Sequence, residues 1–85
     1  MLLKLSQLPS ALELEFFAQL LSSDDIVLVH SAALPMIFNA LPLACQAAVL
    51  EQDAEKIGGK ANAAWQQISQ LELLSLIEHH KTLSW

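Results

Sequence analysis

The sequence predicts a small α/β protein, a single domain over residues 1–85 with a mostly parallel sheet of four to five strands flanked by helices. Short apolar runs alternate with stretches that carry helix-start signals, which is the pattern of strand–helix–strand units. The run IVLVH is apolar throughout, as in a strand covered on both faces of a parallel sheet. A chain of 85 residues supports one core, because two halves of it would be unstable.

The first strand and the first helix are predicted from residues 1–21. MLLKLSQ is short and apolar, and Pro9 ends it, which suits a strand that leads into a helix. SALE places Ser10 at the N-cap and Glu13 at the third helical position, a capping box in which each side chain accepts from the other residue's amide. The helix is expected to run to about Leu21.

The predicted first helix is apolar around most of its circumference. One apolar stripe consists of Leu14, Phe17, Ala18 and Leu21, and a second stripe beside it consists of Leu12, Phe16 and Leu20. A helix with two apolar sides is buried on both, here against its own sheet and against a partner chain. The alternative is that both stripes touch the same small core.

The middle of the chain is expected to form two strands with a cramped crossover between them. After the turn SSDD, the strand IVLVH ends at His30. The next segment is predicted to be a loop and a short helix from Met36 to Leu41, and CQAAVLE is predicted to be the third strand. Ligands of parallel sheets bind beyond the carboxyl ends of the strands, so His30 and the loop 31–35 mark the expected crevice.

Two helices and two strands are predicted in the last third of the chain. Asp53 is expected to be the N-cap of a helix of one or two turns, with Gly58 or Gly59 as its left-handed stop. AAWQQIS is predicted to be a fourth strand, and a second capping box, SQLE, starts a helix that ends near His80. KTLSW is predicted to be a short final strand.

Composition and charge limit the classes of function. The net charge is −5, with four lysines and no arginine, so the chain lacks the basic patch and guanidinium forks that phosphate contacts favour. Direct nucleic-acid binding is therefore not expected. The apolar content of 54% exceeds what one small core can hide, which predicts that another chain covers part of it.

The apolar segments are not expected to be export or membrane signals. Ser6, Gln7 and Pro9 interrupt the apolar start that a secretory signal requires. Pro35 and Pro42 interrupt the apolar stretch 32–50, and breaks in the backbone hydrogen bonds are costly in lipid. The expected compartment is the cytoplasm, with no membrane partner.

No arrangement of residues in the sequence predicts catalysis, a cofactor or a metal. Neighbours on a helix point about 100° apart, so His79 and His80 do not chelate together and are interpreted as helix-end residues. Cys45 is the single thiol, and its sequence neighbours supply neither a cation nor a helix start to lower its pKa. A small buried side chain is favoured for Cys45, with a reactive thiol as the alternative.

Three segments that follow the capped first helix carry a resemblance: SSDDIVLVHSAA, VLEQDAEKIGG and ISQLELLSLIEHHKTLSW. Together they resemble the TusB/DsrH family of small sulfur-relay subunits. In that family the third strand runs into a Val-Leu-x-x-Asp-x-x-x-x-Gly pattern, and the chain closes at or near a tryptophan. The matching residues are Val49, Leu50, Asp53, Gly58 and Trp85.

The resemblance implies a DsrE/DsrH-like fold and a noncatalytic subunit in a heterohexamer with TusC- and TusD-like chains. The Tus complex passes persulfide sulfur between carrier proteins toward 2-thiolation of the wobble uridine in certain tRNAs, and the Dsr complex serves dissimilatory sulfur oxidation. In both, a sister subunit carries the principal acceptor cysteine. Some DsrH-type members have a cysteine in the first helix, at or near Phe17 here, and its absence favours the Tus-type role.

The residues expected to meet partner chains are Leu12, Phe16, Leu20 and Trp85. Trp85 would anchor the last strand against the body of the protein or against a neighbouring subunit, where buried aromatic rings contribute most. Two other hypotheses remain open. The first is that Cys45 itself accepts sulfane sulfur, and the second is that the chain is a generic self-associating α/β interaction domain.

Overall fold

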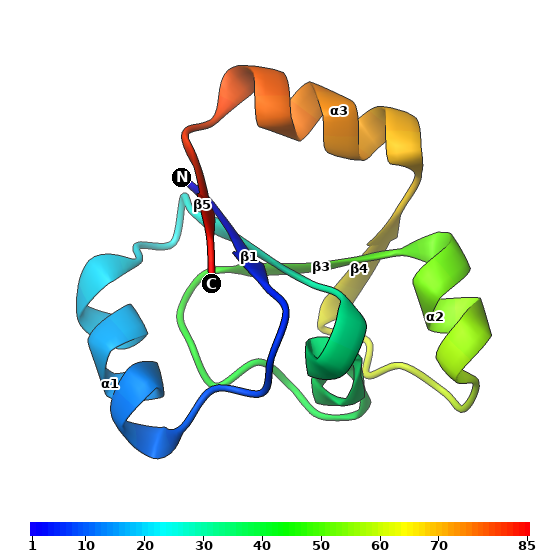
Figure 1. Ribbon diagram of the computed structural model, residues 1–85, viewed down its shortest axis with the longest axis horizontal. Helices are drawn as coiled ribbons and strands as arrows, with labels where there is room; N and C mark the ends of the chain where they lie inside the picture. The colour runs from blue at the N-terminus through cyan, green and yellow to red at the C-terminus, as the bar shows by residue number, and fades with distance from the viewer.

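Five parallel strands form the sheet of the computed structural model, which describes residues 1–85 (Figure 1). The strands are β1 (Leu2–Leu5), β2 (Ile26–Val29), β3 (Gln46–Leu50), β4 (Trp65–Ile68) and β5 (Thr82–Ser84). Their order across the sheet is β4-β3-β2-β1-β5, and every neighbouring pair is parallel. The predicted α/β class with helices flanking a parallel sheet is confirmed.

Three α-helices and one 3-10 helix connect the strands. They are α1 (Ala11–Leu20), η1 (Ser31–Phe38), α2 (Glu51–Ile57) and α3 (Gln70–His79). Both predicted capping boxes are present, at Ser10 with Glu13 and at Ser69 with Glu72, with hydrogen bonds of 2.9 to 3.2 Å. The two longest α-helices therefore begin where the sequence predicts.

The strand order explains which helix covers which face of the sheet. From β1 to β4 the chain steps in one direction across the sheet, and right-handed crossovers then place α1, η1 and α2 on the same face. The connection from β4 back to β5 runs in the opposite direction, so α3 lies on the other face. Figure 1 shows α3 on one side of the sheet and α1 and α2 on the other.

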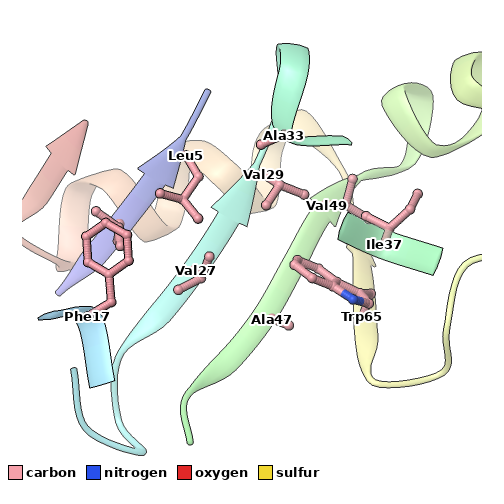
Figure 2. Packing of buried hydrophobic residues seen from close by; sticks show 10 residues of the cluster. Leu5, Phe17, Val27, Val29, Ala33, Ile37, Ala47, Val49 and Trp65 are labelled. Carbon is pink, nitrogen blue, oxygen red and sulfur yellow. The ribbon is translucent and has the colours of Figure 1, made fainter. Parts of the chain in front are cut away.

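The two faces of the sheet have cores of unequal size. Alternate strand residues such as Leu3, Val27 and Val49 pack with Phe17 of α1 and Ile37 of η1 in a cluster of ten buried residues (Figure 2). The opposite face has only five buried residues, and α3 contributes no fully buried side chain to it. The helix α3 alone covers one face of the sheet, whereas α1, η1 and α2 together cover the other face.

Trp65 connects β4 to the segment that follows η1. Its ring is buried in the larger core (Figure 2). Its Nε1 donates to the main-chain oxygen of Asn39 at 2.7 Å. The Asn62 amide also donates to the Ile37 oxygen at 2.7 Å. These bonds hold the long crossover between β2 and β3 against the edge of the sheet.

Two local predictions are wrong. The short helix expected from Met36 to Leu41 is a 3-10 helix that runs from Ser31 to Phe38, directly after β2, and the irregular segment of the crossover follows it instead of preceding it. Asp53 is not an N-cap, since α2 begins at Glu51 and Leu50, the last residue of β3, occupies the cap position. The helix does end at the predicted Gly58, where φ is +76°.

Candidate functional site

The outer side of α1 carries the apolar residues that the sequence predicts as an interface. Leu12 is 76% exposed, Phe16 50% and Leu20 40%, whereas Phe17 on the inner side is fully buried. The two apolar stripes therefore do not share one core. In the stripe that faces the sheet, Leu21 packs against the larger core but Ala18 is exposed.

Trp85 packs against α1 from the end of β5. Its ring meets Phe17 edge-on with the ring centroids 5.1 Å apart, and it lies beside Phe16 at 6.0 Å. The main chain is also held, because Trp85 N–H donates to the Lys4 oxygen at 2.8 Å and Ser6 donates to the Trp85 oxygen at 2.9 Å. The indole remains 43% exposed, so one part of it packs inward and another part faces outward.

Glu13 joins the helix cap to Trp85. One carboxylate oxygen accepts the Ser10 amide at 2.9 Å, and the other accepts the indole N–H of Trp85 at 2.6 Å. These two donors hold the pKa of Glu13 below its ordinary value of 4.5, with the Ser10 amide as the larger cause. The carboxylate stays charged at neutral pH and fixes the orientation of the indole.

We call these exposed residues the α1–Trp85 surface: Leu8, Leu12, Phe16, Leu20 and Trp85. Two hollows, of about 470 and 250 Å³, adjoin Trp85 and Glu13 on it. Leu8 is 57% exposed and was missed in the sequence because it precedes the helix and lies outside the helical wheel. An exposed apolar patch with polar neighbours is typical of a protein–protein contact.

A second site lies at the carboxyl ends of the central strands, where the sequence predicts a crevice. This strand-end crevice has a volume of about 680 Å³, and its polar lining consists of Lys4, His30, Ser31, Asp53 and Lys56. The structure thus brings His30 and the start of η1 into the crevice, as expected. Lys4 and Lys56 were missed, because their position in the lining of one cavity depends on the pairing of β1, β2 and β3.

Cys45 lies at the opposite end of the sheet from the crevice. It directly precedes β3, where the Gln46 amide donates to the Asp25 oxygen at 3.0 Å. The thiol is half-buried against the larger core, and burial raises its pKa above the ordinary value of 9.0, with the charge of Asp25 adding to the rise. A protonated thiol is a weak nucleophile at neutral pH.

The histidine pair occupies the end of α3. His79 Nδ1 lies 2.7 Å from the Ser75 main-chain oxygen, so this nitrogen carries a proton and donates to a carbonyl of the last turn. His80 is the C-cap residue. No group of three or more His, Cys, Asp or Glu side chains is placed to hold a metal ion.

No family model matches the chain, and no curated protein matches it significantly. No helix is both long enough and apolar enough to cross a bilayer.

The outer side of α3 is a further apolar surface that the sequence analysis did not single out. Leu71 is 79% exposed and Leu74 is 55% exposed, while Leu73 and Leu76 face the smaller core. The run of leucines predicts a helix with a buried side. The sequence does not reveal how small the part of α3 is that packs against the sheet. The chain therefore exposes apolar helix faces on both sides of its sheet.

Proposed function

We propose that this protein is a noncatalytic subunit of a cytoplasmic sulfur-relay complex of the TusBCD type, which passes persulfide sulfur toward 2-thiolation of tRNA wobble uridine. Its partners are TusC- and TusD-like chains of similar size, and its role is to assemble and orient them. The proposal rests on the family resemblance in the sequence. The observation that carries the assembly role is the α1–Trp85 surface.

The α1–Trp85 surface has the composition of a contact between proteins. Two aromatic rings, Phe16 and Trp85, stand side by side on it, and aromatic side chains dominate binding energy at interfaces. The bonds of Trp85 to Glu13 and to strand β1 hold the indole in place before a partner arrives. A preorganised side chain loses less conformational entropy on binding.

Two further features fit a subunit without its own chemistry. The raised pKa of Cys45 disfavours a persulfide acceptor on this chain. A subunit inside a hexamer contacts more than one neighbour, and α3 presents Leu71 and Leu74 on the other side of the sheet from α1. We assign the sulfur-accepting step to a sister subunit.

Native mass spectrometry of the tagged chain, purified gently from its own cells, tests the proposal. The expected result is an assembly with two copies each of this chain and of two other small chains, one of which bears a persulfide. Recovery of the chain alone, or of copies of itself only, would contradict the sulfur-relay proposal. A self-associated form would favour the generic interaction domain.

The interface assignment has its own test with a matched control. The double variant Leu12→Asp and Phe16→Asp places two charges on the α1–Trp85 surface and is expected to abolish co-purification of the sister chains. The control Ala11→Asp and Ala18→Asp adds the same charge to exposed positions of the same helix, outside that surface. Intact assembly in the first variant would mean that another face binds the partners.

A further inference from the structure

The strand-end crevice collects half of the cationic side chains of an acidic protein. The chain has four lysines and a net charge of −5, and two of the lysines, Lys4 and Lys56, line this one cavity. The single ion pair of the structure joins the Met1 amino group to Asp25, so neither lysine has a carboxylate within 4.0 Å. Two unpaired cations therefore face the same space.

Lys4 is an unusual residue for its position in the sheet. Its neighbours along β1, Leu3 and Leu5, are fully buried, and in register it faces Leu28 of β2. Its side chain is half-buried on the face that α3 covers. The part of the side chain that stays exposed lines the crevice, and no carboxylate of this chain lies within 4.0 Å of its ammonium group. The positive charge of Lys4 is therefore available to an anion that enters the crevice.

The lining of the crevice offers hydrogen-bonding groups as well as charge. Ser31 has φ +53°, a left-handed backbone conformation that no other non-glycine residue of the chain adopts. Its hydroxyl lies 2.9 Å from His30 Nδ1, and both residues line the cavity. Strained backbone of this kind is concentrated at binding and catalytic sites.

We propose that the strand-end crevice binds a small organic anion, with its carboxylate or phosphate group between Lys4 and Lys56. Asp53 also lines the cavity, so the net positive charge is small and a singly or doubly charged ligand fits better than a polyphosphate. Leu28, Leu50 and Leu73 form an aliphatic wall for an apolar body, and about 680 Å³ lies within the range of small-molecule sites.

This inference is independent of the proposed sulfur-relay role. The residues that line the crevice include none of the residues that form the α1–Trp85 surface or its hollows. A partner bound to that surface therefore leaves the crevice residues free. Failure of the ligand proposal would leave the assembly proposal standing, and the reverse also holds.

The test is a titration of the isotopically labelled full chain, followed by amide chemical shifts, with benzoate, phenyl phosphate and neutral benzyl alcohol as probes. The two anions are expected to give saturable shifts in the amides of residues 30–34 and 53–57. The anion that binds more tightly shows whether the crevice prefers a carboxylate or a phosphate group. Benzyl alcohol is expected to bind at least about tenfold more weakly than that anion.

The four lysines supply matched variants for the same titration. Lys4→Met and Lys56→Met keep most of the side-chain volume and are each expected to raise the Kd of the stronger anion about tenfold. Lys60→Met and Lys81→Met remove the same charge outside the crevice and are expected to leave the Kd within about twofold. The comparison of the anions with benzyl alcohol uses the unaltered chain, so it does not depend on the folding of any variant.

Several outcomes would overturn the proposal. One is the absence of a saturable shift with either anion up to about 10 mM. Such a result would mean an affinity too weak for a specific small-molecule site. Others are equal binding of benzyl alcohol, shifts confined to the α1–Trp85 surface, or equal weakening by all four lysine variants. The last result would mean that the anions respond only to overall charge.

Discussion

At the scale of single residues, Trp85 links the last strand to the first helix. The indole packs in a T-shaped arrangement with Phe17, which belongs to the larger core, and its N–H donates to Glu13 in the cap of α1. The rest of the ring is exposed beside Phe16. Trp85 thus stabilises the fold with one part of its surface and leaves another part available for a partner.

Trp85→Ala is expected to lower the free energy of unfolding of the isolated chain by about 2 kcal/mol, less than for a fully buried aromatic ring. Trp85→Phe keeps much of the packing, loses the bond to Glu13 and is expected to cost about 1 kcal/mol or less. Urea denaturation followed by circular dichroism measures both. An alanine variant as stable as the wild type would mean that the ring does not contribute to the fold.

The reactivity of Cys45 is expected to depend on pH in a specific direction. Because burial and Asp25 raise the pKa of the folded thiol above 9.0, its reaction with a disulfide reagent at pH 7 should be slower than in the urea-unfolded chain. The ratio of folded to unfolded rate should increase as the pH approaches about 10, where the unfolded thiol is already ionised. A folded thiol that reacts faster at pH 7 would restore Cys45 as a sulfur acceptor.

At the scale of elements, the two sides of α1 have different functions. The buried side contributes Phe17 to the core, and the exposed side forms most of the α1–Trp85 surface. The helix is only ten residues long and makes few buried contacts, so its N-terminal cap matters for its stability. An assembly surface on a frayed helix would be poorly ordered.

Ser10→Ala is expected to destabilise the isolated chain by about 1 kcal/mol, because the Glu13 amide loses its acceptor at 3.1 Å. Ser75→Ala is the control, since Ser75 is exposed on α3 and its hydroxyl makes no hydrogen bond to the protein; a change within about 0.5 kcal/mol is expected. Thermal denaturation compares the two. Equal effects would show that the cap contributes nothing specific.

At the scale of the whole molecule, one sheet holds together two unequal cores. Leu2 and Leu3 are adjacent in β1, both fully buried, and belong to the smaller and the larger cluster respectively. The strands are shared by both clusters, so loss of either core removes support from the other. We therefore expect the chain to unfold in a single cooperative transition.

Leu3→Ala is expected to cost about 3 kcal/mol, a large part of the roughly 4 to 13 kcal/mol typical of a domain of this length. Leu12→Ala, at a position 76% exposed, is the control and is expected to stay within about 0.5 kcal/mol. Trp65 fluorescence, read in a Trp85→Phe background, and circular dichroism should give the same midpoint for each variant. Two separate midpoints would contradict a shared unfolding unit.

Features that depend only on residues within one turn or one strand could be predicted from the sequence. Both capping boxes, the apolar strands and the glycine that ends α2 follow from such local signals. The start of α2 was misplaced because burial, and not the local capping signal, decides it. Asp53 has the chemistry of an N-cap, but β3 passes directly into the helix, and the burial of Val49 and its neighbours decides where the strand ends.

The positions of apolar and charged residues relative to one another depend on contacts between distant segments of the chain. Sequence periodicity showed two apolar stripes on α1 but not that the sheet covers one of them and leaves Leu12 and Phe16 exposed. Lys4 and Lys56 line the same cavity because β1, β2 and β3 are neighbours and α2 follows β3. Strand order depends on how all apolar faces are buried at once, and no local stretch of sequence contains that information.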